Sequence, residues 1–352
     1  MYTIPHSRPY VNLEDSNAVA MQVMTGMHAT GAKTEEFEKK MCSFIGMKYG
    51  KAINSGANAL FISLKALGVG KGDEVVIPSY VCQSLMHAVY RCGARPVLVD
   101  ITRNFIQKGF NINAENIQGA INGKTKAIIV PHMFGVPAEI DEIIKLGVGV
   151  IEDSAQGLGA EYKGKKAGSF GVISVFSFYA TKIISTGQGG MIMANKIELK
   201  NKIDDLMKYD ERDSYNIAFN YGLTDLQSAL GIRQLEKLGM FIDRRREIGK
   251  RYDSAFSEKF EIMKIDEGAF PFRYLVMFNS MEERDKMQMR LKEKGISCAK
   301  PVFKPLHRYL GLNGENFKNT EDAHSKVLSI PCYPALTDEE VEYVVGSILD
   351  AV

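Results

Sequence analysis

The stretch FSFYATK, residues 176–182, begins as an apolar strand and ends on a lysine. A second stretch, VGVIEDSAQ at residues 148–156, also starts as an apolar strand and reaches its first charged residues at Glu152 and Asp153. A short apolar run that stops at polar residues is typical of a buried strand in a parallel sheet. The two stretches therefore predict two buried strands whose carboxyl ends carry polar side chains.

The chain alternates strand and helix patterns around these stretches, from about residue 34 to residue 195. Further buried strands are expected at 74–77, 96–99, 127–130 and 191–193, and helices at 59–67, 83–92 and 140–146. Thr34 is expected to cap a helix whose first turn holds Glu35 and Glu36. Such alternation predicts βαβ units and a mostly parallel sheet, which is an α/β fold.

The pattern changes in the last third of the chain. A long helical pattern covers residues 226–252, a strand is expected at 273–278, and helices are expected at 282–294 and 338–349. These elements predict a large domain at 13–235 and a smaller α+β domain at 236–352. Residues 1–12 are expected to pack near the smaller domain.

Composition excludes several classes of function. The 352 residues carry a formal net charge of +2, so no electrostatic footprint for nucleic acid is expected. Five cysteines without a CxxC pair fit a reducing cytoplasm. No apolar run approaches the length of a membrane span. The six histidines lack metal-ligand spacing, and we expect no metal.

Ligands of open parallel sheets bind beyond the carboxyl ends of the strands. Asp100, His132, Asp153 and Ser177 fall at such ends. Lys182, Asp153 and Ser177 together supply what pyridoxal phosphate (PLP) needs. The lysine amine can form a Schiff base with its aldehyde, the aspartate carboxylate can pair with its pyridine nitrogen, and the serine hydroxyl can donate to its phosphate. The expected large domain is therefore the PLP-binding one.

Two glycine-containing loops add to this interpretation. NSGANAL, residues 54–60, opens a helix, where free backbone N–H groups favour an anion. GQGG, residues 187–190, reads as a tight turn into a strand. Each feature also has a plainer explanation: a helix cap at residues 55 and 153, a surface side chain at Gln156, and a lysine that snorkels to solvent at residue 182.

Together these motifs resemble the DegT/DnrJ/EryC1/StrS family of PLP-dependent sugar aminotransferases over almost the whole chain. The motifs that carry the resemblance are EDSAQ (152–156), FSFYATK (176–182), GQGG (187–190), GDEVVIPSY (72–80), PHMFG (131–135) and LSIPCYP (328–334).

The resemblance implies fold type I of PLP enzymes, with a mostly parallel seven-stranded sheet in the large domain, and a homodimer with shared active sites. It also assigns roles to individual residues. Lys182 would be the Schiff-base lysine and Asp153 the pyridinium partner, with Gln156 and Cys82 beside the ring, Ser55, Gly56, Ala57 and Ser177 at the phosphate, Asn220 at the phosphate of the neighbouring subunit, and His307 and Tyr80 on the substrate side.

Three positions depart from the family pattern. Ala57 stands where the family has threonine, which removes one phosphate hydroxyl. Val81-Cys82 occupies the place of a ring-stacking aromatic residue. Gly222 replaces an arginine near the expected interface, which removes a charge.

The implied activity is a ping-pong transamination from glutamate or glutamine to a keto sugar, with a nucleotide-linked sugar expected. Alternative acceptors are a cyclitol or another non-nucleotide ketose. A dehydratase branch of the family has histidine at the lysine position, so Lys182 argues against it. A non-catalytic regulatory or binding relative is disfavoured because it would not need Lys182, Asp153 and Ser177 together.

Overall fold

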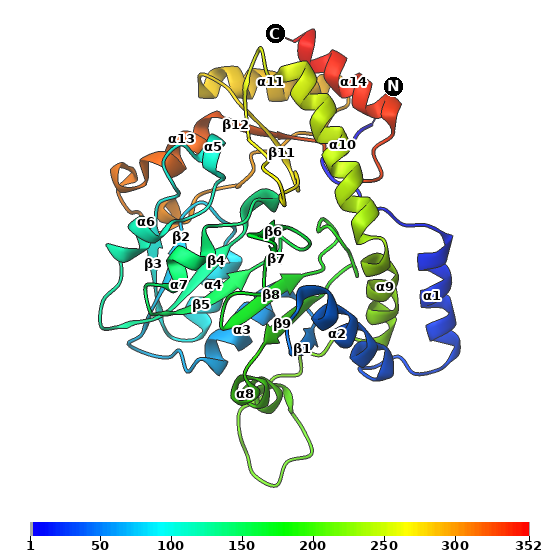
Figure 1. Cartoon of the computed structure of the whole chain (residues 1–352), viewed down its shortest axis with the longest axis vertical. Coiled ribbons are helices and arrows are strands. Elements are labelled where there is room, and N and C mark those ends of the chain that lie inside the picture. Colours follow the sequence, from blue (N-terminus) through cyan, green and yellow to red (C-terminus); the bar gives the residue numbers. More distant parts are fainter. Residues whose placement is uncertain (1–2, 352) are drawn as a thin grey trace.

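A computed structural model describes residues 3–351 and contains the predicted sheet of seven strands, in the order β1-β9-β8-β5-β4-β2-β3 (Figure 1). β9 runs antiparallel to both of its neighbours, and the other pairs are parallel. The strands are β1 (Tyr49–Ile53), β2 (Glu74–Pro78), β3 (Arg95–Val99), β4 (Thr125–Pro131), β5 (Gly149–Asp153), β8 (Ile173–Ser177) and β9 (Gly190–Ala194). The predicted α/β architecture is confirmed.

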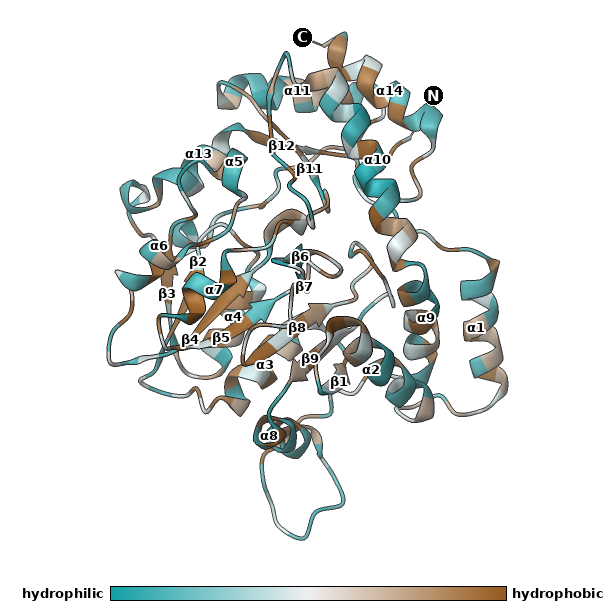
Figure 2. Ribbon diagram, in the orientation of Figure 1, coloured by the Kyte–Doolittle hydropathy of each residue, from teal (hydrophilic) through white to brown (hydrophobic). Residues whose placement is uncertain are grey.

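Helices cover both faces of this sheet (Figure 1). Alternate strand residues such as Val75 and Ile77 pack with α3 (Gly56–Ala66) and α4 (Ser84–Arg91), whereas Val76 packs on the opposite face with α6 (Ala114–Gln118) and α7 (Ile140–Ile144). Because both faces are buried, the inner strands are mostly apolar, and Figure 2 shows brown along much of their length. The short α5 (Phe105–Lys108), η1 (Met133–Gly135) and the ribbon of β6 (Glu161–Tyr162) and β7 (Lys165–Lys166) lie in the connections.

A second sheet, of three antiparallel strands, lies at the other end of the molecule (Figure 1). It consists of β10 (Glu261–Ile262), β11 (Tyr274–Met277) and β12 (Val327–Ile330). Its apolar core is shared with α10 (Leu238–Phe256), α11 (Met281–Glu293) and α14 (Asp338–Leu349). α12 (Leu306–Tyr309), η2 (Gly314–Phe317) and α13 (Lys318–Lys326) connect the strands β11 and β12 together with α11.

Two segments run between the sheets. α9 (Asp225–Glu236) and α10 meet at Lys237 and form one path. The other path is the N-terminal strap, which we define as residues 3–12. Ile4 pairs with Ile296 beside the small sheet, and at the far end of the strap the Lys237 ammonium donates to Asn12 at 3.0 Å. α1 (Leu13–Met24) then packs along α9, at the right of Figure 1.

The start of α2 (Ala32–Ile45) differs from the expectation. Gly31 is the N-cap residue, and Thr34 lies inside the first turn. The cap comes instead from Asp225, whose carboxylate accepts hydrogen bonds from the backbone of Gly31 at 2.8 Å and Thr34 at 2.9 Å, and from the Thr34 hydroxyl at 2.8 Å. Thr34 was predicted wrongly because a capping partner nearly two hundred positions away leaves no local signal.

In the part of the chain that the structure describes, no helix is both long enough and apolar enough to cross a lipid bilayer.

Candidate functional site

The carboxyl ends of β5 and β8 place the expected residues side by side. Asp153 is the last residue of β5, and Ser177 is the last residue of the adjacent parallel strand β8. Lys182 follows in a loop whose two ends are held together by a hydrogen bond from the Phe178 amide to the Gly189 carbonyl at 2.9 Å. Inside the loop the Lys182 amide donates to Tyr179 at 2.8 Å, which fixes a tight turn at the lysine.

A close approach of backbones forms a cradle next to Ser177. A Cβ atom on Gly190 would lie 2.8 Å from the Gly56 nitrogen, so only glycine lets the start of β9 lie against α3. Ser55 caps α3 by accepting from the Asn58 amide at 3.2 Å. The amides of Gly56 and Ala57 belong to the first turn, where a helix offers no carbonyl partner. Two free amides and the Ser177 hydroxyl fit a phosphate group.

Asp153 is a buried carboxylate, with 7% of its surface exposed. One of its oxygens accepts from the Ala155 amide at 3.0 Å. Burial raises the pKa of Asp153, and the positive charges of Lys182 and His132 oppose that rise only in part. A buried carboxylate that lacks a direct cationic partner fits a protonated pyridine nitrogen, which would supply the missing positive charge.

Lys182 lies in a setting that favours its neutral amine. Its Nζ atom is 5.8 Å from the centre of the Phe272 ring. Burial lowers the pKa of the Lys182 amine and Arg273 lowers it further, while the acids of Cys82 and Asp153 act in the opposite sense. A neutral amine is the nucleophilic form that attacks an aldehyde. The geometry thus fits covalent attachment of PLP at this residue.

Three further residues that the sequence predicts at the cofactor come from other segments of the chain. Gln156 accepts from the Phe134 amide at 3.1 Å, which fixes its side chain at the end of β5. Cys82 is exposed, and its thiol acts to raise the pKa of the Lys182 amine. Asn220 is also exposed, and its neighbour Tyr221 accepts from the Asn54 amide at 2.7 Å, which brings Asn220 to the entrance of α3.

The two residues expected on the substrate side, Tyr80 and His307, are both buried. Tyr80 has no exposed surface and stacks on Phe110 with a centroid distance of 5.7 Å. His307 is 1% exposed, and both ring nitrogens are engaged, with the Ser79 hydroxyl at 2.7 Å and Glu321 at 2.6 Å. His307 therefore holds the loop after β2 against α12 and offers no free group to a substrate.

Asp100 and His132 also serve the fold rather than the site. Asp100 accepts from the backbone of Asn319 at 2.9 Å and Thr320 at 2.8 Å, so it fixes the start of α13. His132 is fully buried, pairs with Glu152 at 2.9 Å and accepts from the Ala138 amide at 3.1 Å. Strand-end position alone did not separate these structural residues from Asp153 and Ser177.

Sequence reasoning missed the contribution of the segment before β11. Phe272 lies beside Lys182, and Arg273 contributes to the charge that Lys182 experiences. An aromatic residue and an arginine at the start of a strand are usual in any small domain. Nothing local marks them, because only the return of the chain from the small sheet brings them to Lys182.

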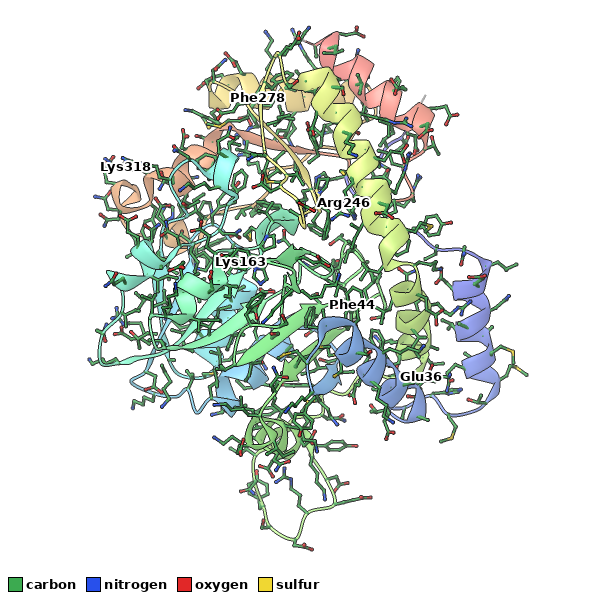
Figure 3. The ribbon with its side chains drawn as sticks, viewed as in Figure 1. Glu36, Phe44, Lys163, Arg246, Phe278 and Lys318 are labelled. Atoms are coloured by element: carbon green, nitrogen blue, oxygen red, sulfur yellow. The ribbon has the colours of Figure 1, made fainter. Side chains whose placement is uncertain are left out.

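A spacious hollow of the described structure lies away from these residues. It has a volume of about 690 Å³ and is lined by residues that include Phe44 of α2 and Arg246 of α10, both labelled in Figure 3. Neither Lys182, Asp153 nor Ser177 lines it. Cavity volume alone therefore does not identify the cluster of chemically matched residues.

Comparisons with known proteins agree with this geometry. Residues 10–349 match the sequence profile of the DegT/DnrJ/EryC1/StrS aminotransferase family. The chain is 34% identical to uncharacterized protein MJ1066 of Methanocaldococcus jannaschii, over 98% of this chain and 96% of that protein. It is 31% identical to GDP-perosamine synthase of Escherichia coli O157:H7, over 92% and 91% of the two chains.

Solved structures extend the similarity to three dimensions. Spr1654 from Streptococcus pneumoniae, described as a sugar aminotransferase and solved in a PLP form, superposes with a TM-score of 0.92 at 26% identity, over 99% of this chain and 98% of the other. The fold predicted from the sequence, that of a PLP-dependent transferase, is therefore confirmed.

Proposed function

The chain belongs to the DegT/DnrJ/EryC1/StrS aminotransferase family and is a PLP-dependent sugar aminotransferase, and from this premise we propose its substrates and residue roles. The amino group comes from glutamate or glutamine, and a nucleotide-linked keto sugar receives it. In this assignment residues 13–235 hold PLP, and residues 236–352 close the site from the other side.

One observation carries the proposal: the end of β8 and the loop after it bring Lys182 beside buried Asp153, while Ser177 lies against the first turn of α3. Lys182 would hold the aldehyde of PLP, Asp153 its ring nitrogen, and Ser55, Gly56, Ala57 and Ser177 its phosphate. When bound, PLP supplies an electron sink for the carbon that loses or gains a proton.

The protein's own groups then have distinct tasks. The Lys182 amine would take up and then return the proton that moves at the substrate carbon, as base and then as acid, and its lowered pKa favours the neutral form that acts as the base. Asp153 stays fixed through its bond to the Ala155 amide and maintains the charge on the ring nitrogen. Gln156 and Cys82 border the ring.

A basic hollow of about 680 Å³ supports a nucleotide-linked acceptor. Its lining includes Arg273, Lys300, Lys304 and Arg308 but no carboxylate, which suits phosphate groups. Relatives that act on nucleotide sugars, such as GDP-perosamine synthase, point the same way. If a free ketose or cyclitol reacted as well as nucleotide sugars, the nucleotide part of the proposal would be withdrawn.

We further propose a homodimer with shared sites. Apolar side chains are exposed on α1, as at Leu13 (73%) and Met24 (81%), and on the segment after α8 (Ile197–Met207), as at Tyr215 (93%). Asn220 lies at the end of that segment and would contact the phosphate in the partner subunit.

Mixing two inactive variants tests the shared site. Lys182→Ala and Asn220→Asp homodimers should each be impaired, whereas mixed dimers should regain activity because one site then receives Lys182 and Asn220 from different subunits. Additive residual activity without recovery would contradict the sharing of Asn220.

The absorption spectrum of the purified protein tests the central assignment. A visible band that glutamate bleaches is expected from PLP linked to Lys182 and a working first half-reaction. A band that neither glutamate nor glutamine changes would exclude both donors. The absence of a band after reconstitution with PLP would refute the placement of the cofactor.

A further inference from the structure

Arg273 is a guanidinium without a carboxylate partner. Within residues 3–351 no acidic side chain forms an ion pair with it, and its one polar contact is the His6 imidazole at 3.2 Å. The His6 ring nitrogen Nε2 is in turn 2.8 Å from the Ser329 hydroxyl. An arginine carries five N–H donors, so most of the hydrogen-bonding capacity of Arg273 is uncommitted.

The charge on Arg273 is also uncompensated. Burial and the nearby Arg245 lower the pKa of Arg273 to about 10. Arg273 therefore remains cationic at neutral pH, although burial and Arg245 both make its charged form less favourable. Arg245 cannot relieve it, because Arg245 is itself a buried cation that donates to the backbone carbonyls of Phe272 and Cys332. A bound anion would supply the missing negative charge.

The position of Arg273 indicates which anion would bind to its guanidinium. Arg273 and Thr181 line one small hollow, and Thr181 precedes Lys182 directly. Phe272, the residue before Arg273, has its ring 5.8 Å from the Lys182 amine. Arg273 also lines the basic hollow that holds Lys300 and Lys304, so it borders both that hollow and the small one beside Thr181.

We propose that Arg273 binds the α-carboxylate of the amino donor. This inference rests on the proposed transamination, in which an amino acid must present its α-amino group where Lys182 can move the proton. Every amino-acid donor carries a carboxylate on that same carbon, and a planar guanidinium binds it through two parallel hydrogen bonds. Arg273 is the unpaired guanidinium that the small domain contributes beside Lys182.

His6 sets the direction of the guanidinium. Burial and the charge of Arg273 lower the pKa of His6 to about 3, so the ring is neutral and does not repel Arg273. Its contacts link Ser329 of β12 to Arg273 at the start of β11. The orientation of the Arg273 guanidinium is thereby fixed by the N-terminal strap as well as by the backbone next to β11.

Single-turnover bleaching of the PLP band tests the assignment. We would compare wild type, Arg273→Gln and Arg273→Lys with three donors: glutamate, glutamine and 4-aminobutanoate, which lacks the α-carboxylate. Loss of one partner of a buried charge pair should reduce the rate constant per molar donor about 100-fold for glutamate and glutamine in Arg273→Gln. The slow rate with 4-aminobutanoate should change by less than about threefold.

Two controls separate this role from others. Lys318→Gln removes an exposed charge that pairs with Glu315 at 3.1 Å, outside the proposed site, and should leave all three donor rates near wild type. Glutarate, a dicarboxylate that cannot react, tests the specificity for the carboxylate on the reacting carbon. It should protect Arg273→Gln against thermal unfolding less than it protects wild type, because the carboxylate that matches the α position loses its guanidinium partner.

Each other outcome overturns the proposal. Equal losses with all three donors would make Arg273 a structural residue, and losses with glutamate and 4-aminobutanoate alone would assign it to the γ-carboxylate. Unchanged rates would leave Arg273 to the phosphates of the acceptor. If no amino acid bleaches the wild-type band, the proposed function fails first, and that result is distinct from all of these.

Discussion

A Cβ atom added to Gly56 would lie 2.8 Å from the Cβ of Ser177. The first turn of α3 and the end of β8 therefore touch at Gly56 and Ser177, which both have small side chains. The contact holds two free amides and one hydroxyl in fixed positions, which is what a phosphate group requires. The contact is possible because glycine has no Cβ atom at position 56.

Gly56→Ala is expected to weaken PLP binding. The added methyl group must displace Ser177 or tilt α3, and we expect a loss of about tenfold or more in affinity, which corresponds to about 1.4 kcal/mol. Fluorescence titration of the apoprotein with PLP measures the change. Gly239→Ala is the matched control, because a Cβ there meets no atom within 4 Å. If the two variants bound PLP with equal affinity, the proposed phosphate site at Gly56 and Ser177 would be refuted.

Lys182→Ala is expected to abolish both half-reactions. The amine is the group in the site that can both hold the cofactor and carry the proton, so no neighbouring residue replaces it. Product formation and bleaching by glutamate are the measurements. Lys318→Ala serves as the control, since Lys318 is exposed and pairs only with Glu315 at 3.1 Å (Figure 3). Turnover at the wild-type rate in Lys182→Ala would exclude the assignment.

Asp153→Asn is expected to lower kcat and to raise the stability of the apoprotein at neutral pH. Removal of one fixed electrostatic contact typically costs 10²–10³ in kcat, and we expect a loss of roughly that size. Because burial raises the pKa of Asp153 in the folded chain, its favourable contribution to folding exists below the unfolded pKa and disappears as pH rises through the folded value.

The pH dependence follows from that sign. The apoprotein of Asp153→Asn should be more stable than wild type at neutral pH, and the advantage should vanish in acid. Thermal unfolding of both apoproteins across pH 4–8 measures this difference. A wild-type apoprotein that is the more stable of the two at neutral pH would show that Asp153 has a stabilising partner in the absence of PLP.

His307→Phe is expected to reduce stability more than substrate binding. The variant loses the contacts of both ring nitrogens, with Ser79 and Glu321, while the ring can still stack on Phe317. We expect a loss of about 1–3 kcal/mol in the free energy of unfolding, because buried polar partners are left unpaired. Chemical denaturation measures it. An unchanged stability with a raised KM would restore His307 to the substrate side.

The sequence predicted those parts of the structure that local patterns determine. The apolar runs at 74–77, 96–99, 127–130 and 148–151 became β2, β3, β4 and β5, because a strand buried on both faces must be apolar throughout. β1 was missed. YGKAI holds one lysine and one glycine and lies at the sheet edge, where burial is incomplete.

The candidate site was predictable where chemistry and strand ends coincide, as at Asp153, Ser177 and Lys182. It was not predictable where distant segments meet. Tyr80 belongs to an aromatic cluster in the core, which its motif does not reveal. Arg273 reaches the site only through the fold of the small sheet, so no spacing in the sequence links it to Lys182.

The N-terminal strap gives the two halves of the molecule a second connection besides the covalent path through α9 and α10, and noncovalent contacts of Ile4 and His6 attach it to the small sheet. A body attached at a single point can turn about any axis, but one attached at two points is left with a hinge whose axis passes through both. Opening and closing of the small domain should follow that one axis. Because His6 lies on the strap and contacts Arg273, any such swing moves the guanidinium along a fixed arc toward or away from Lys182.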